Sequence, residues 1–427
     1  MTVLKASARD GTLALMRRLS TPLRLLVITQ FAFNVGFYLV VPFIAAHLAE
    51  DLALAGWVIG LVLGLRTFSQ QGLFFLGGAL ADRFGIRATI LIGILVRIVG
   101  FVTMGLAGEV WSVMLGVTLI GLAAALFSPA VESALTAWAG DLEAAGGPRR
   151  IDVIGLEMMA SKLGTIVGPI LGGVLLVVPF TTTCFVAAGV FALILAAHLV
   201  WLPAGARVGS SSRVGESLRG VLSNRRFLWF ALIHCTYLVS YNQLYLAVPV
   251  ELTRIGAPSA QITWLFGLAA VLVIGLQLPV TRAVAHWSMS RTLAHGYGLM
   301  AAGFVAVAGF AALPPLPGIL AYVPSVLFVI GLHLGQILVL PAARATVADL
   351  AGGHRLGSHL GMLASIGGAA VLVVSTAIGV ILPWSSHTSA AAPVPWLLLA
   401  VLPALSAVGA VAFSRRCLST DSRKGNP

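Results

Sequence analysis

Residues 181–202 read TTTCFVAAGVFALILAAHLVWL, an apolar run without a single Asp, Glu, Lys or Arg. A helix of about 20 such residues is long enough to cross the hydrocarbon core of a bilayer. Because lipid offers no hydrogen-bond partners, a spanning segment is either a helix or a strand of a closed barrel. Barrel strands are short and alternate in polarity, so this run predicts a transmembrane helix.

The composition extends this conclusion to the whole chain. Of its 427 residues, 59% are apolar and only 9% are charged, and the mean hydropathy is +1.01. A water-soluble protein of this size would expose much of that apolar surface. The three cysteines are far apart and the histidines show no metal-ligand spacing, so we expect no disulfide framework, no metal site and no cofactor.

Apolar runs of about 20 residues predict twelve transmembrane helices. The first run continues for a full span and has no small-residue cleavage pattern after it, so we expect a retained helix rather than a signal peptide. The predicted spans cover residues 23–48, 57–80, 88–107, 111–138, 151–176, 181–202, 226–250, 260–281, 292–312, 318–342, 358–382 and 394–413.

The basic residues predict the orientation of these helices. If both termini and every second loop lie on one side, that side holds nearly all Lys and Arg of the loops and tails, and the opposite loops hold only Arg254. The positive-inside rule therefore places both termini in the cytoplasm. We expect a bacterial inner (plasma) membrane protein, whose net charge of +12 reflects topology and not a nucleic-acid partner.

The longest polar segment, residues 203–224, predicts the domain organisation. It separates an N-terminal segment (1–22) and an N-terminal six-helix bundle (23–202) from a C-terminal six-helix bundle (226–413) and a tail (414–427), with a cytoplasmic linker at 203–225. Residues 156–164 and 360–368 support this division, because they share the pattern L-x-M-x-A-S-x-x-G. We expect two bundles related by a pseudo-two-fold axis along the membrane normal, with a cavity between them.

The most specific motif lies between the second and third spans, where residues 77–87 read GGALADRFGIR. It resembles the G-x-L-A-D-R-x-G-R-K/R loop of the major facilitator superfamily, except that Ile86 replaces a basic residue. The resemblance implies a gate that holds the outward-facing state. Small residues allow close helix packing, and the acid can pair with an arginine or a helix N-terminus. The predicted gate residues here are Gly78, Asp82, Arg83, Gly85 and Arg87. The corresponding second-half loop, residues 281–291, lacks the acid.

Residues 164–173 read GTIVGPILGG and resemble the G-x-x-x-G-P-x-x-G-G signature. Within this superfamily that signature is associated with antiporters, chiefly drug exporters. The glycines permit close helix packing, and the proline removes one backbone hydrogen bond and bends the helix. A packing role without directional meaning is the alternative. The motif residues are Gly164, Gly168, Pro169, Gly172 and Gly173.

Two further segments and one residue restrict the resemblance to one family within the superfamily. They are residues 64–72 (GLRTFSQQG), residues 127–130 (FSPA) and Arg97. Together with the two motifs they are similar to the twelve-span drug:proton antiporter family, particularly its enterobacterial multidrug resistance protein H branch. This implies an all-α integral membrane protein of the major facilitator fold. The implied activity is proton-coupled multidrug efflux, and so antibiotic resistance, with a small-molecule substrate, protons and membrane lipids as partners.

Other functions stay open at this stage. The chain is expected to be monomeric and not an enzyme, and it has no phosphate-binding loop of an ATP-driven pump. A transporter of one specific metabolite, lipid or peptide is the first alternative. A non-transporting membrane receptor is the second.

Charged residues within the spans are functional candidates, because each costs about 2.5 to 3.5 kcal/mol to insert and needs a partner or a water-lined cavity. Proton coupling further requires a carboxylate whose pKa changes when it is hydrated or dehydrated. Glu132 and Glu157 are the carboxylates considered, and Glu157 is the deeper. The first span offers only Gln30 and Asn34 where better-known exporters keep acids. Glu132 and Arg344 occupy equivalent places in the two halves, which predicts either a gating pair or two solvated charges.

Polar and aromatic side chains in the spans predict a substrate cavity suited to amphipathic compounds. Arg66 either faces this cavity or pairs with Asp82 near the gate. The polar cluster at residues 241–243 is the most specific part of the set. The candidates are Asn34, Tyr38, Arg66, Gln70, Tyr237, Tyr241, Asn242 and Gln243.

Overall fold

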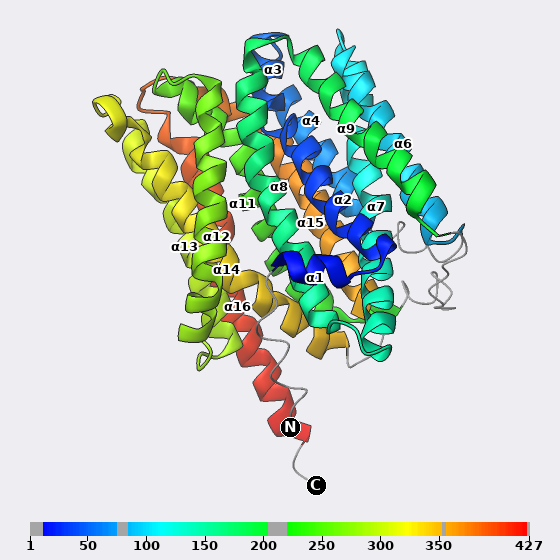
Figure 1. Ribbon diagram of the computed structural model, residues 1–427. Coiled ribbons are helices and arrows are strands. Elements are labelled where there is room, and N and C mark those ends of the chain that lie inside the picture. The colour runs from blue at the N-terminus through cyan, green and yellow to red at the C-terminus, as the bar shows by residue number, and fades with distance from the viewer. Residues whose placement is uncertain (1–11, 75–83, 204–219, 352–355, 425–427) are drawn as a thin grey trace. The chain divides into compact units, whose positions relative to one another are not determined.

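A computed structural model describes residues 12–74, 84–203, 220–351 and 356–424, with side chains as far as Arg415. Over these residues the chain forms helices and no β-strand (Figure 1). The helices are α1 (Thr12–Arg18), α2 (Thr21–Tyr38), α3 (Ile44–Glu50), α4 (Gly56–Thr67), α6 (Ile86–Gly105), α7 (Val110–Ala144), α8 (Arg150–Val174), α9 (Phe180–Trp201), α11 (Arg225–Arg254), α12 (Ile262–Ala283), α13 (Met289–Ala311), α14 (Val323–Ala351), α15 (Leu356–Ile381) and α16 (Pro393–Lys424).

Within the described residues, ten helical segments are long and apolar enough to cross a membrane. They coincide with ten of the twelve predicted spans, and the prediction of an all-α membrane protein is confirmed. The second predicted span coincides with α4 and the π-helical turn Phe68–Gly72 that continues it, after which the chain passes outside the described residues at 75–83. The seventh coincides with α11, which is 30 residues long but less apolar.

By its contacts the chain falls into two compact units, each of which is considered by itself. The first unit comprises Met1–Val41 and Leu73–Ser211, and the second comprises Pro42–Gly72 and Ser212–Pro427. The chain passes from the first to the second within the predicted linker. The second unit also includes α4, because that helix packs along α15. The predicted domain boundaries themselves stay a prediction.

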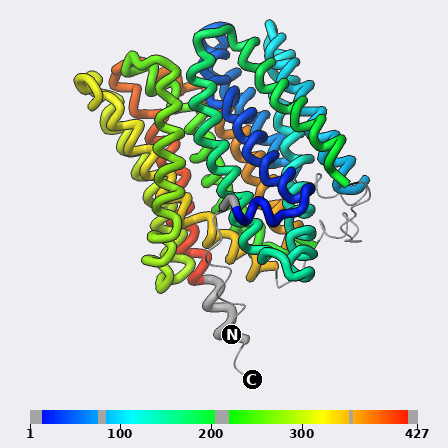
Figure 2. The backbone as a smooth tube through the Cα atoms, in the orientation of Figure 1, coloured from blue at the N-terminus to red at the C-terminus, as the bar shows by residue number. Residues whose placement is uncertain are grey.

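In the first unit, α2 packs against α8 and α9, and α6 packs against α7 and α9 (Figure 2). The guanidinium of Arg97 is fully buried in this core, 4.1 Å from the ring centroid of Phe33 and 5.3 Å from those of Phe37 and Phe191. Cation–π attraction reaches about 2 kcal/mol when the cation is desolvated. The aromatic rings therefore offset part of the cost of placing this charge in a membrane protein core.

In the second unit, α13 packs against α14 and α16, and α11 packs against α15. The helices α4 and α15 approach so closely that their backbones touch. A Cβ atom on Gly60 would meet the backbone oxygen of Ser375, and one on Gly64 would lie 2.9 Å from the Cα of Leu372. The pattern Gly56-x-x-x-Gly60-x-x-x-Gly64 explains this contact. That pattern is visible in the sequence but is absent from the motifs singled out above.

Candidate functional site

Two hydrogen bonds join α2 to α8 within the first unit. The side-chain amide of Gln30 donates to Oε1 of Glu157 over 2.6 Å, and that of Asn34 donates to Oγ of Ser161 over 3.1 Å. Both pairs are 127 residues apart in the chain, so the two helices run in the same direction in a fixed register. We call these four residues the α2–α8 polar seam.

Two glycines of the 164–173 motif continue the same contact. A Cβ atom on Gly164 would lie 2.5 Å from the backbone oxygen of Phe31, and one on Gly168 would lie 2.6 Å from the Cβ of Tyr38. Any larger residue would therefore force α8 away from α2. In this structure the motif glycines set the short distance at which the polar seam forms. Of the other motif residues, Pro169 and Gly172 are buried and Gly173 is half-buried.

Glu157 is half-buried, and the amide of Gln30 is its hydrogen-bond partner. Across the described parts of the chain, no basic side chain forms an ion pair with it. Lys162 lies five residues further along α8 and is also half-buried. A carboxylate inside a membrane span that is held by one neutral amide is well placed to exchange a proton, because among the described residues no fixed cation pairs with its ionised form.

The predicted gate is only partly described. Gly78, Asp82 and Arg83 lie outside the described residues, and with them the predicted Arg66–Asp82 pair. Gly85 begins α6 with φ of 87°, a left-handed conformation that favours glycine. Arg87 donates from Nη2 to the backbone oxygen of Leu199 over 2.9 Å. A cation at this position stabilises the last turn of α9, where backbone carbonyls lack helical partners.

Glu132 and Arg344 are both exposed side chains. They belong to different units, so their pairing stays a prediction.

A second polar network crosses three helices of the second unit. Arg66 is 4% exposed and donates to Oγ1 of Thr67 over 2.9 Å and to Oε1 of Gln70 over 3.3 Å. Thr67 donates to Oδ1 of Asn242 over 2.9 Å, and the Asn242 amide donates to Oγ of Ser375 over 3.0 Å. The network therefore links α4, α11 and α15, and Asn242 is buried at its centre.

Tyr237, Tyr241 and Tyr245 form a row along α11 at intervals of four residues. Successive ring centroids are 6.3 and 6.1 Å apart, and the Arg66 guanidinium lies 5.3 Å from the ring centroid of Tyr245. The structure thus brings five of the predicted cavity residues together in the second unit, namely Arg66, Gln70, Tyr237, Tyr241 and Asn242. Gln243 is fully buried and its amide donates to the carbonyl of Val239 on its own helix.

The remaining cavity candidates, Asn34 and Tyr38, are half-buried on α2 in the first unit. The structure shows contacts that sequence reasoning missed, notably those of Ser161, Thr67 and Ser375. Intramembrane hydroxyl and amide groups require partners, which is the signal that could have drawn attention to them.

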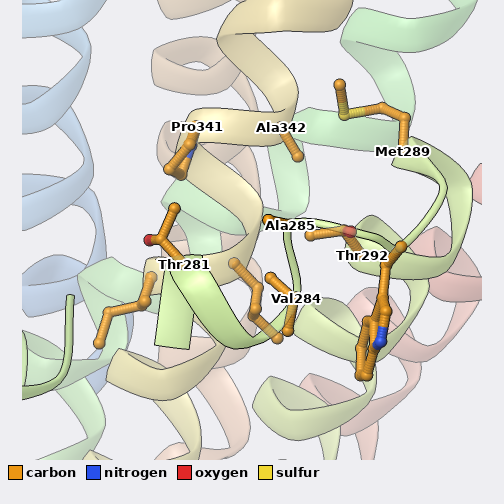
Figure 3. A pocket seen from close by; sticks show the side chains of 10 residues that line it. Thr281, Val284, Ala285, Met289, Thr292, Pro341 and Ala342 are labelled. Atoms are coloured by element: carbon orange, nitrogen blue, oxygen red, sulfur yellow. The ribbon is translucent and has the colours of Figure 1, made fainter. Parts of the chain in front are cut away.

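A separate cavity lies in the second unit, where α12 ends and α13 begins (Figure 3). Its volume is about 220 Å³. None of the predicted substrate residues lines it. The lining residues are Thr281, Val284, Ala285, Trp287, Met289, Thr292, Ile337, Leu338, Pro341 and Ala342.

Known proteins resemble this chain over most of its length. The model of the Major Facilitator Superfamily matches residues 26–376. An uncharacterized MFS-type transporter of Mycobacterium tuberculosis is 36% identical over 377 residues, covering 86% of this chain and 88% of that protein. Multidrug resistance protein MdtH of Escherichia coli O9:H4 is 31% identical over 386 residues, covering 88% of this chain and 90% of that protein.

Solved structures show the same fold at low sequence identity. The nucleoside transporter NupG has a TM-score of 0.76 with 13% identity and covers 92% of this chain and 99% of its own. A POT family transporter in complex with 5-aminolevulinic acid has a TM-score of 0.73 with 11% identity and covers 94% and 99%. At these identities the similarity extends to the fold alone.

Proposed function

The chain belongs to the major facilitator superfamily, and from this membership we propose that it exports hydrophobic or amphipathic small molecules in exchange for protons. It is a multi-pass membrane protein of a transporter family. Export of several drugs is supported by the 31% identity to MdtH over most of the chain and by the antiporter motif at residues 164–173. The proposed mechanism is alternating access, in which a binding site opens to one side of the membrane at a time.

The observation that carries the proposal of proton coupling is the hydrogen bond between Gln30 and Glu157. When ionised, the Glu157 carboxylate accepts this bond as an anion inside a membrane span. When protonated, it is neutral and its cost of burial falls. A conformational change that hydrates or dehydrates the α2–α8 polar seam would therefore change the proton affinity of Glu157, which is the condition for exchanging a proton against a substrate.

The test uses the full chain reconstituted in proteoliposomes with an imposed pH gradient and a panel of dyes and antibiotics. The unsubstituted protein is expected to accumulate several panel members, and an uncoupler is expected to abolish the accumulation. Glu157→Gln removes the exchangeable proton and is expected to remove the response to the gradient. Asp349→Asn is the matched control, because this exposed carboxylate lies in the second unit. Accumulation by wild type that is indifferent to the uncoupler would reject proton coupling.

A transporter of one specific substrate is the second candidate. The buried Arg66 beside the tyrosine row favours it, because a cation fixed next to aromatic rings can recognise a particular anionic or aromatic compound. The same panel separates the two candidates. Accumulation of one compound class alone supports the specific transporter, whereas accumulation of unrelated compounds supports multidrug export.

The proposed location is a bacterial inner membrane with both termini in the cytoplasm. Arg254 is the one basic residue of the loops on the opposite side, and the positive-inside rule depends on this asymmetry. We further propose that one chain is the transporting unit.

A further inference from the structure

The cavity at the α12–α13 junction (Figure 3) has a chemical character that the transport proposal does not use. Thr281 donates its hydroxyl to the carbonyl of Gln277 over 2.6 Å, and Thr292 donates to that of Ser288 over 3.2 Å. Both hydroxyls are thus bonded to their own chain segments. The other lining residues are apolar apart from the indole of Trp287, so the cavity presents a predominantly apolar wall.

The cavity is several times larger than one water molecule, which occupies about 30 Å³ in the liquid. An apolar cavity of about 220 Å³ gains most from an apolar occupant, because water inside it would find few hydrogen-bond partners. It lies where two candidate membrane spans end and begin, at Ala283 and Met289. An occupant can therefore enter from the membrane interface.

The α12–α13 junction, which forms one side of the cavity, carries only positive charge. Arg282 and Arg291 are exposed, and each is next in sequence to a threonine that lines the cavity. His286 and His295 are exposed on the same segments. No Asp or Glu occurs anywhere in residues 255–348. The surface that these residues form therefore attracts anions.

This loop is the counterpart of the gate loop in the first half, because both lie between the second and third predicted spans of their half. The second-half loop, residues 281–291, holds His286 and Trp287 and lacks an acid. It thus has an imidazole and no carboxylate. It also has an indole, a group that is enriched at membrane–water interfaces, and the Trp287 ring lies 4.7 Å from that of His295. The second-half loop therefore has no carboxylate that would repel an anion.

We propose that this cavity binds one anionic phospholipid. Its phosphate pairs with Arg282 and Arg291, and its acyl chain enters the apolar cavity beside Trp287 and Met289. In this proposal the two arginines form a basic rim, which together with the apolar interior matches the two ends of such a lipid, and the membrane supplies it directly. A free phosphate would use the rim alone and leave the cavity unfilled.

The experiment measures lipid binding to the full-length protein by native mass spectrometry in mild detergent. Phosphatidylglycerol is compared with phosphatidylcholine of identical acyl chains. The expected result is one tightly bound phosphatidylglycerol and no comparable phosphatidylcholine. The double variant Arg282→Gln with Arg291→Gln is expected to weaken the tight binding about thirty-fold, which corresponds to about 1 kcal/mol for each arginine. Arg225→Gln with Arg226→Gln is the control, because these arginines are exposed elsewhere on the same unit.

A second variant tests the cavity without changing any charge. Ala285 lines the cavity, so Ala285→Trp fills it, whereas Ala283→Trp adds the same side chain at a neighbouring exposed position outside the lining. Tight binding should be lost in the first and retained in the second. The proposal is overturned if phosphatidylglycerol binds equally to wild type, to the double arginine variant and to Ala285→Trp. It is also overturned if inorganic phosphate displaces the lipid completely, because the rim alone would then account for binding.

Discussion

Gln30 on α2 donates a 2.6 Å hydrogen bond to the carboxylate of Glu157 on α8. A neutral amide is thereby placed against an acid within a membrane span. In this structure the acid on the fifth predicted span is paired with a polar residue of the first. The two residues form one candidate unit for proton exchange, and this relationship gives the first prediction.

Gln30 is expected to act through Glu157. Gln30→Ala should reduce gradient-driven transport by roughly thirty-fold, the effect of losing about 2 kcal/mol, which is within the range for a hydrogen bond to a charged group. Glu157→Gln should abolish the response to the gradient. The double variant should transport no worse than Glu157→Gln alone, because residues that act as a pair are non-additive. Rates measured in proteoliposomes decide this, and a further loss in the double variant would assign Gln30 an independent role.

Close packing at the antiporter motif predicts a stability difference between two glycines of the same helix. Gly168→Ala places a methyl group 2.6 Å from the Cβ of Tyr38, and such overpacking costs about 1 to 3 kcal/mol. Gly155→Ala meets no atom within 4 Å and should be neutral or slightly stabilising, because alanine favours the helix. Thermal unfolding in detergent measures both. Equal melting temperatures would contradict the close contact between α2 and α8.

Asn242 is expected to stabilise the second unit through its two hydrogen bonds. Asn242→Ala leaves Thr67 and Ser375 without these partners, at a cost of about 1 to 3 kcal/mol for each buried group that stays unsatisfied. Asn224→Ala is a less damaging control that also removes two hydrogen bonds, the cap at the start of α11 and a part-buried bond to the carbonyl of Leu350. The cap is worth about 1 kcal/mol, and Asn224 is only half-buried. A fall in melting temperature no larger than that of the control would contradict the network.

Topology is testable with single cysteines in a background that lacks Cys184, Cys235 and Cys417. Thr253→Cys and Ser223→Cys place exposed thiols at opposite ends of α11. A membrane-impermeant maleimide applied to intact cells should label Thr253→Cys and leave Ser223→Cys unlabelled until the cells are opened. Labelling of Ser223→Cys from outside would reverse the proposed orientation.

Much of the secondary structure follows from residues 181–202 and the runs that resemble them. A spanning helix needs only a sufficient length of apolar sequence, because lipid forces every backbone hydrogen bond to form within the segment. This is a local property, and ten of the predicted spans coincide with helices that meet it. The weaker agreement at α11 has a physical cause, since its mean hydropathy is lowered by polar and charged residues such as Asn242, Gln243 and Glu251 that the fold buries.

The sequence alone determined that this chain is a helical membrane protein of a transporter family, and which residues are unusual for lipid. Only the tertiary structure decided which of them meet. Gln30 is hydrogen-bonded to Glu157, 127 residues away in the chain. The helix α4 packs on α15, and the basic loop after α12 lines an apolar cavity together with α14. Helix formation depends on neighbours in the chain, whereas side-chain pairing depends on the rotation and register of two helices, which are set by packing at glycines such as Gly60 and Gly168.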